Sequence, residues 1–137
     1  MSLTLRVLAP DQSVFDGTAD EVILPSTTGL LGILPGHISL VTAIDVGVLQ
    51  VLTNGSWSSI ALMGGFAEVE ADDVTVLVNG AELGTTINGN TAQTELERAQ
   101  AELDQLADLE NSSEKLKAQE KFNRARARLQ ASNNPKS

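Results

Sequence analysis

His37 is the one histidine of the chain, and its side chain is the first candidate for chemistry. An imidazole titrates near neutral pH and can serve as a general acid or base. Catalysis would also need a nucleophile or substrate and a group that orients the ring. His37 follows Pro35-Gly36 and precedes a run of Ile, Leu and Val, and no motif ties it to a serine or an aspartate. We therefore expect a turn or contact residue rather than a catalytic one.

Two other stretches invite a chemical interpretation. The paired glycines of Met63–Val69 suggest a phosphate loop, but such a loop needs a longer glycine spacing, a lysine and a following helix. We interpret Gly64-Gly65 as a turn or bulge. The acidic segments Asp20–Leu24 and Glu70–Thr75 lack the ligand spacing of a calcium loop and lie in strand-like patterns, so no metal site is expected.

Composition excludes several functions. The chain has no cysteine, which rules out disulfides, thiolate nucleophiles and cysteine metal sites. A net charge of −9 argues against nucleic-acid binding, which depends on Lys and Arg at phosphates. No segment approaches the roughly 20 apolar residues of a membrane helix, so we expect a soluble or peripheral protein with no transmembrane segment. Trp57 and the three phenylalanines are too few for a base-stacking platform and are better core or interface anchors.

Charge divides the chain into two parts. Residues 1–90 contain ten acidic residues and a single basic one, Arg6, whereas residues 91–137 contain eight of each sign. The first part also alternates apolar and polar residues in short bursts, at 3–8, 20–25, 47–52, 59–63, 66–71 and 74–79. Turn signals lie between them, at Asp16-Gly17, Thr28-Gly29, Pro35-Gly36, Asn54-Gly55, Gly64-Gly65 and Asp72-Asp73. This pattern predicts an antiparallel β-sandwich or flattened barrel.

The second part has helical periodicity. Ala92, Leu96, Ala99, Leu103 and Leu106 form one apolar stripe, and Ala118, Phe122, Ala125 and Leu129 form another. Asn90 with Gln93, and Asn111 with Glu114, are possible helix starts of the capping-box kind. The two helices should fold back as an antiparallel hairpin, with an acidic first helix beside a basic second one.

We expect this hairpin to be marginally stable. Alanines bury little apolar area, at about 25 cal/mol per Å², and exposed ion pairs contribute only about 0 to 1 kcal/mol each. The hairpin should therefore detach or open while the sandwich stays folded.

Two long segments, Asp20–Val51 and Ala61–Asn79, strongly resemble the epsilon subunits of rotary proton-translocating ATP synthases, most closely the cyanobacterial and chloroplast form. The resemblance extends over the whole chain. It implies a β-sandwich in residues 1–86 that binds the gamma subunit and the c-subunit ring, and a regulatory hairpin in residues 87–137. In this family the extended helices reach the alpha and beta subunits and hinder ATP hydrolysis. The resemblance further implies a subunit that is not catalytic, requires no cofactor, and lies peripherally on the cytoplasmic or stromal face of an energy-transducing membrane, with the thylakoid as the expected one.

The resemblance also assigns candidate residues. Gly32, Pro35, Gly36 and His37 match the loop that faces the c-ring, and Leu30 stands where many members carry an acidic residue. Pro35 and the glycines would fix the shape of this loop. The basic residues of the second helix would hold the extended, inhibitory state through contacts with acidic segments of the beta subunits: Lys115, Lys117, Lys121, Arg124, Arg126 and Arg128.

Some bacterial members bind ATP in the hairpin through a motif of Ile or Leu, Asp, two variable residues, Arg and Ala. In this chain Arg98 and Ala99 fit, but Thr94 replaces the aliphatic residue and Glu95 replaces the aspartate. Arg124 and Arg128, one turn apart, are suited to a phosphate. We favour ion pairs or contacts with the catalytic hexamer for these arginines, with ATP binding as the alternative.

Two other classes of function stay open from the residues alone. A free-standing β-sandwich binding module with a helical dimerisation tail would form a homodimer through residues 91–130. An enzyme that used His37 would lose its turnover on His37→Ala.

Overall fold

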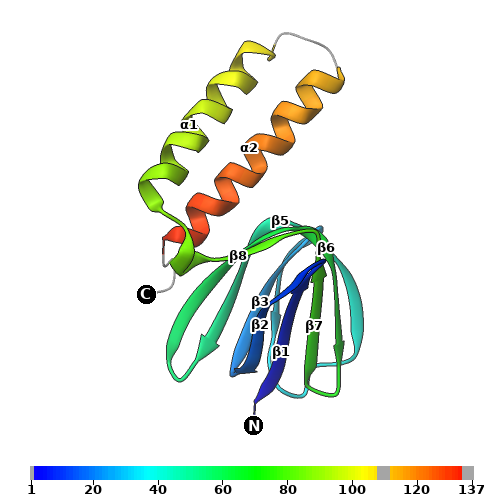
Figure 1. Cartoon of the computed structure of the whole chain (residues 1–137). Helices are drawn as coiled ribbons and strands as arrows, with labels where there is room; N and C mark the ends of the chain where they lie inside the picture. The colour runs from blue at the N-terminus through cyan, green and yellow to red at the C-terminus, as the bar shows by residue number, and fades with distance from the viewer. Residues whose placement is uncertain (1, 108–111, 134–137) are drawn as a thin grey trace.

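The computed structural model describes residues 2–107 and 112–133. Their strands are β1 (Leu3–Ala9), β2 (Gln12–Ala19), β3 (Glu21–Ser26), β4 (Gly29–Ile33), β5 (Leu40–Thr53), β6 (Ser56–Glu70), β7 (Asp73–Val78) and β8 (Ala81–Leu83). A 3-10 turn, η1 (Gly84–Thr86), leads to the helices α1 (Gly89–Gln105) and α2 (Ser113–Ser132). Figure 1 shows the strands wrapped into a sandwich, with the two helices standing side by side above one end of it.

The strands form one continuous sheet in the order β2-β1-β7-β6-β5-β3-β4, with β8 paired to β6. The predicted sandwich is confirmed, but the prediction that all its pairs are antiparallel is wrong, because β1 pairs with β7 in parallel. The alternating pattern of a half-buried strand is the same in either direction, so it carries no information about which way a neighbour runs.

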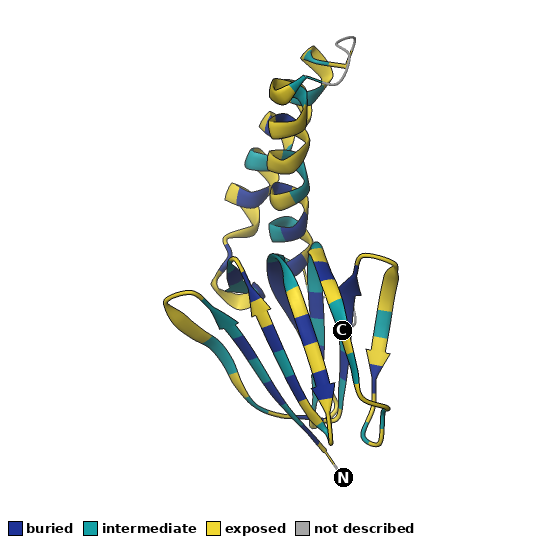
Figure 2. Ribbon diagram, turned by 90° about the vertical axis from the view of Figure 1, so that its right-hand side faces the viewer, coloured by how far each residue is buried: buried dark blue, intermediate teal, exposed yellow. Residues whose placement is uncertain are grey.

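The core lies between the folded halves of the sheet. Residues in strands such as β1 and β7 alternate between buried and less buried positions, as Figure 2 shows by colour. Leu3, Leu5 and Val7 of β1 and Val74 and Val76 of β7 are fully buried. Burying each such side chain contributes about 1.5–3 kcal/mol, so the sandwich has a substantial core of its own.

β6 is a single long strand rather than two strands separated at Gly64-Gly65. The pairing of β6 with β5 keeps the same register on both sides of these glycines, so they are not a turn. Both have positive φ, and a Cβ at Gly65 would lie 2.1 Å from the carbonyl oxygen of Leu77. The glycines therefore let β6 bend as it passes from its partner β7 to its partner β8.

The turn predictions had mixed outcomes. Asn54 and Gly55 both have positive φ and join β5 to β6, which confirms a two-residue turn of the expected kind. Asp16-Gly17 lies inside β2, so that turn prediction is wrong. The β6–β7 turn is centred on Ala71 and Asp72, one residue earlier than predicted.

The helices form the predicted hairpin, but α1 begins earlier than predicted. Asn88 is its N-cap and accepts a hydrogen bond from the backbone N–H of Thr91, so the expected start at Asn90 is wrong. Ser112 caps α2 by accepting from the N–H of Lys115. The predicted cap at Asn111 lies outside the described residues.

The hairpin contacts the sandwich through its base. The C-terminal half of α2 packs against β5, β6 and η1. A small apolar cluster joins the two parts, with Ala61, Ile87, Ala92 and Ala131 buried and Val48, Met63 and Leu129 partly buried. Ala127 and Ala131 are buried on α2 in addition to the predicted stripe. Within the described residues, no helix has both the length and the apolar character that crossing a membrane requires.

Candidate functional site

The loop around His37 is a turn that a neighbouring hairpin holds in place. The backbone N–H of His37 donates to the carbonyl of Leu34 at 3.1 Å. Gly36 has a φ of 86°, and its N–H donates to the Oδ1 atom of Asp72, 2.7 Å away in the β6–β7 turn. Gly32, by contrast, lies in β4 and has room for a side chain. The shape of the loop therefore depends on Gly36 rather than on Gly32.

The ring of His37 contacts the backbone beside it. Its Nδ1 atom lies 2.8 Å from the carbonyl oxygen of Ile38, within hydrogen-bond distance of the backbone. Among the residues that the structure describes, no carboxylate or hydroxyl is hydrogen-bonded to the ring, and no group of side chains could hold a metal ion. The geometry fits a turn or contact residue.

Large apolar side chains surround this loop and face solvent. Leu30 and Ile38 are each 77% exposed, and Leu34 and Val41 are more than half exposed. Exposed large apolar side chains commonly mark a site of protein interaction when they form a patch.

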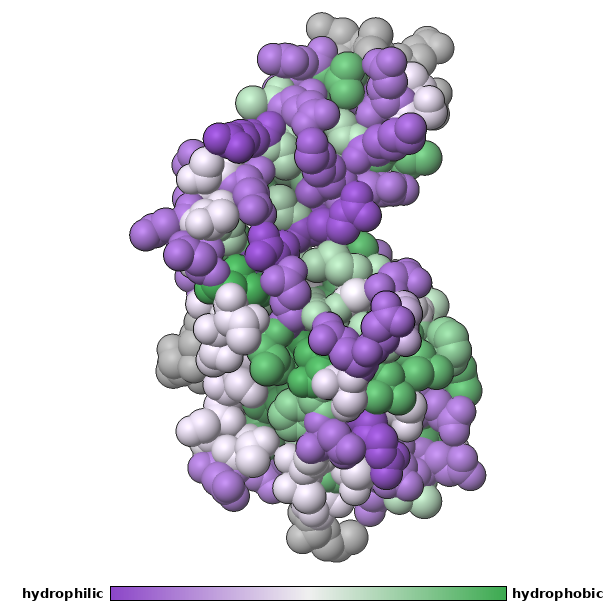
Figure 3. Space-filling view, viewed as in Figure 1, coloured by the Kyte–Doolittle hydropathy of each residue, from purple (hydrophilic) through white to green (hydrophobic). Residues whose placement is uncertain are grey.

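A second apolar surface crosses the outer face of the sheet. Ala43 pairs with Phe66, Phe66 pairs with Leu77, and Leu77 pairs with Leu8, so the four side chains form a row across β5, β6, β7 and β1. Phe66 is 49% exposed and Leu77 is 39% exposed. Figure 3 shows apolar side chains gathered on one face of the sandwich, whereas hydrophilic ones cover the hairpin. We call Leu8, Ala43, Phe66 and Leu77 the apolar row.

A cavity of about 480 Å³ lies between the hairpin and the sandwich. It brings together the four candidate ATP residues: Glu95 and Arg98 of α1, and Arg124 and Arg128 of α2. Met63, Glu82 and Lys121 also line it. Spacing along each helix places the members of each pair on one face, and the folded hairpin brings the two pairs together.

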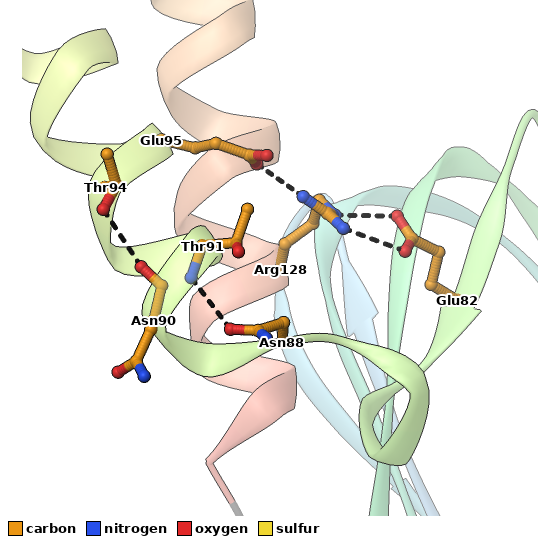
Figure 4. A network of polar contacts seen from close by, with 7 residues as sticks. All are labelled: Glu82, Asn88, Asn90, Thr91, Thr94, Glu95 and Arg128. Carbon is orange, nitrogen blue, oxygen red and sulfur yellow. Dashed lines mark hydrogen bonds and ion pairs between the residues drawn. The ribbon is translucent and has the colours of Figure 1, made fainter.

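Arg128 is the most extensively bonded side chain of this cavity (Figure 4). Its Nε donates to Glu82 at 2.8 Å, its second terminal nitrogen donates to the other Glu82 oxygen at 3.2 Å, and its first terminal nitrogen donates to Glu95. The pKa of Arg128 is raised above its ordinary value, chiefly because its guanidinium donates hydrogen bonds to Glu82. The cation is therefore already neutralised by two carboxylates.

The six basic residues of α2 do not share one face. Lys117, Lys121, Arg124 and Arg128 follow a spacing of four, three and four residues, and they line the cavities beside α1. Lys115 and Arg126 are eleven residues apart and lie on the other side of the helix, where Arg126 stacks over Phe122 at 5.3 Å. Lys115 lies at the start of α2, and its Nζ donates to the carbonyl of Ala107, just past the end of α1, at 3.3 Å. Lys121 pairs with Glu102 at 3.2 Å. In the docked hairpin, much of the positive charge is thus turned toward the acidic helix.

Two residues of this site were not singled out by the sequence. Glu82 binds Arg128 from β8, 46 positions away in the chain, and no spacing rule links residues so far apart. Gly84 packs so closely that a Cβ would lie 2.1 Å from the carbonyl oxygen of Ala131 and 2.9 Å from that of Ser59. The signal that could have drawn attention to both is their place at the junction of the two parts.

This architecture defines a class of protein: a β-sandwich with exposed apolar surfaces for protein partners, joined to a charged helical hairpin that docks through its base. Family models define it further. Residues 2–84 match the ATP synthase delta/epsilon chain β-sandwich domain, and residues 86–133 match the long α-helix domain of the same chain. The chain belongs to the ATP synthase delta/epsilon chain family, which confirms the resemblance found in the sequence.

Similar proteins agree with this assignment. The chain is 76% identical over 131 residues to the ATP synthase epsilon chain of Prochlorococcus marinus (strain MIT 9303), covering 96% of this chain and 98% of that one. It is 72% identical over 132 residues to the ATP synthase epsilon chain of Parasynechococcus marenigrum (strain WH8102), with 96% and 97% covered.

Solved structures share the fold at low identity. One is a chain in the Euglena gracilis mitochondrial ATP synthase (OSCP/F1/c-ring), with a TM-score of 0.79, 19% identity, and 96% of this chain and 81% of that chain covered. Another is a chain in the Tetrahymena thermophila mitochondrial ATP synthase central stalk/c-ring, with a TM-score of 0.61, 13% identity, and 97% and 98% covered.

Proposed function

We propose that the chain is a non-catalytic central-stalk subunit of a proton-translocating ATP synthase, which couples the gamma subunit to the c-ring and inhibits ATP hydrolysis through its helices. The observation that carries this proposal is the match of both family domains, in order, together with near full-length relatives named ATP synthase epsilon chain. The cyanobacterial relatives favour a peripheral position on the thylakoid membrane. Residues 1–86 would bind the rotor and residues 87–137 would regulate it, with no cofactor required.

The apolar row is the surface we assign to the gamma subunit. Phe66 and Leu77 are its large exposed side chains, and the row runs across four neighbouring strands, β5, β6, β7 and β1. The test is capture of this protein by a purified gamma subunit. Phe66→Asp should abolish capture, whereas Leu116→Asp, an equally disruptive change on an exposed apolar side chain of α2, should not. Unchanged capture by Phe66→Asp would contradict the assignment, and a homodimer without gamma binding would favour a dimerisation tail instead.

The loop Gly32–His37 is the surface we assign to the c-ring, supported by the exposed apolar residues around it. The chain lacks cysteine, so His37→Cys would introduce a single thiol, and every cross-linked adduct formed through a thiol of this chain would come from position 37. Adducts with the c subunit in the assembled complex are expected. Adducts with gamma alone would reassign the loop. His37→Ala should weaken assembly before it affects any chemistry.

The basic residues of α2 supply an account of inhibition. Acidic segments of the beta subunits would attract them once the helices extend. Neutralising Arg124, Arg126 and Arg128 should relieve inhibition of ATP hydrolysis, most clearly at low salt. Persistent inhibition at both low and high salt would contradict this role. Because Arg126 lies on the other side of α2 from Arg124 and Arg128, testing it separately would identify the face that binds.

We infer that the arginines of the cavity serve ion pairs rather than ATP. The pairing of Arg128 with Glu82 and Glu95 supports this inference, because a triphosphate would have to displace two carboxylates from it. Calorimetric titration of the protein with ATP is the test. Micromolar binding would overturn the inference.

A further inference from the structure

We propose that the docked hairpin is held by a latch at its base, in which Arg128 is clasped by Glu82 and Glu95 while Gly84 seats the end of α2. The four residues are called the latch below. The proposed function makes the helices regulatory but does not say what keeps them docked. The latch supplies that missing part and can be tested without any other subunit.

The clasp joins three separate elements. Arg128 is on α2, Glu82 is on β8 of the sandwich, and Glu95 is on α1. Figure 4 shows the guanidinium between the two carboxylates, one on each side. Only 26% of the Arg128 side chain is exposed, so its charge is partly shielded from solvent. The same side chain thus fixes α2 to the sandwich and α2 to α1.

The seat at Gly84 is steric. The hydrogen atom of this glycine points toward the carbonyl of Ala131 on one side, and the carbonyl of Ser59 in β6 lies close by. Both are backbone atoms and cannot turn away as a long side chain would. Any larger residue at position 84 would push the last turn of α2 off the sandwich.

The other contacts between the hairpin and the sandwich bury little apolar area, so the docking equilibrium depends mainly on the latch. The buried residues between the hairpin and the sandwich are mainly alanines, at positions 61, 92 and 131, together with Ile87, and the larger Val48, Met63 and Leu129 are only partly buried. An alanine side chain removes little apolar area from water. Beyond the latch, the ion pair Lys121–Glu102 joins only the two helices and is about half exposed or more on both sides.

The latch also uses a residue of the proposed inhibitory face. Three of the five N–H donors of Arg128 are held by Glu82 and Glu95, so an external carboxylate can take these donors only by displacing the internal ones. Docking within the chain and binding to an acidic partner therefore compete for one cation. Acidic surfaces would draw the hairpin out, and loss of the internal carboxylates would release it without a partner.

The experiment measures docking in the isolated full-length chain. Spin labels at Gln12→Cys on β2 and Gln119→Cys on α2 report the distance between the sandwich and the hairpin, and the chain has no other cysteine. Glu82→Gln combined with Glu95→Gln should lower the ratio of docked to released molecules about tenfold or more, because charge-assisted hydrogen bonds are lost. Gly84→Ala should do the same for a steric reason.

Matched controls separate the latch from a general loss of stability. Glu97→Gln removes an exposed carboxylate from α1 that accepts only from Gln93 of the same helix among its recorded hydrogen bonds. Gly89→Ala adds a methyl group in ordinary contact, 3.7 Å from the Ser132 hydroxyl. Both controls should keep the distance of the unmodified protein.

A salt titration of the unmodified protein needs no substitution, so it tests the latch even where a variant fails to fold. Raising potassium chloride should shift molecules toward the released distance, since the Debye length falls to about 3 Å at about 1 M. An unchanged distance in the glutamine double variant, in Gly84→Ala and across the salt series would overturn the latch. None of these outcomes depends on gamma binding or on inhibition, so they cannot be confused with a failure of the proposed function.

Discussion

Replacing Arg128 by methionine tests how strongly one cation couples the two parts of the protein. Methionine keeps an unbranched apolar stem but removes all the guanidinium donors. In the unmodified protein these donors reach Glu82 at 2.8 and 3.2 Å and also reach Glu95. The substitution leaves the two carboxylates facing a cavity without their shared cation, so repulsion adds to the lost bonds.

The size of the coupling follows from the exposure of the partners. Fully exposed ion pairs contribute about 0–1 kcal/mol, whereas hydrogen bonds to charged groups contribute about 1.5–3 kcal/mol. The Arg128 side chain is 26% exposed and that of Glu82 is 41% exposed, which lies between these limits. We expect a coupling of about 1–2 kcal/mol between Arg128 and Glu82, or a five- to thirtyfold change in the docking equilibrium.

The assay is a double-mutant cycle of Arg128→Met and Glu82→Gln. Each variant is measured by native-state hydrogen exchange of the amides of α2 and β6. The cycle removes the costs that each substitution causes alone. Faster exchange should be confined to the helices, while the amides of β6 keep their protection. The equivalent cycle of Lys121 and Glu102, which are 64% and 49% exposed, should give less than about 1 kcal/mol. Equal couplings for the two pairs, or faster exchange in β6, would refute the reasoning.

Three further predictions concern the sandwich and the effect of pH. Leu62→Ala removes a fully buried side chain of β6 and should destabilise the sandwich by about 3–5 kcal/mol, measured by chemical denaturation. Gly55→Ala forces a side chain into a φ of 81° and should cost about 1–2 kcal/mol, measured in the same way with Gly89→Ala as the control. The folded-state pKa of Arg128 is raised, so its contribution to docking is complete below the unfolded pKa and is lost only as pH rises through the folded one. Label distances should therefore be constant between about pH 7 and about pH 10.

The sequence predicted the strands with strong alternation and missed those without it. β1 and β7 have apolar residues at every second position and were placed to within a residue or so. β2 has exposed or half-buried side chains along most of its length, and a Gly inside it was interpreted as a turn. β4 contains two glycines, and β8 has only three residues. Such strands form because neighbouring strands supply backbone hydrogen bonds to them. The pattern of apolar residues within one segment contains no information about these neighbours.

The candidate site was predicted where its residues share a helix. Arg98 follows Glu95 by three positions, and Arg128 follows Arg124 by four, so helical geometry alone places each pair on one face. That the two pairs line the same cavity followed from folding the hairpin. Glu82 and Gly84 act through tertiary contacts with α2, and a contact between positions so far apart has no signature in spacing.

The position of the latch explains how a weak contact can control a large element. α2 touches the sandwich near its C-terminal end, whereas the C-terminal end of α1 and the N-terminal end of α2 lie far from it (Figure 1). A small displacement at Gly84 and Ala131 is therefore carried outward along the whole length of both helices. Because the buried alanines between hairpin and sandwich contribute little free energy, a change of about 1.4 kcal/mol at Arg128 alters the docking equilibrium constant tenfold. The two-state behaviour expected from an alanine-rich hairpin thus depends on a few polar and steric contacts at its base rather than on the stripes that hold the helices together.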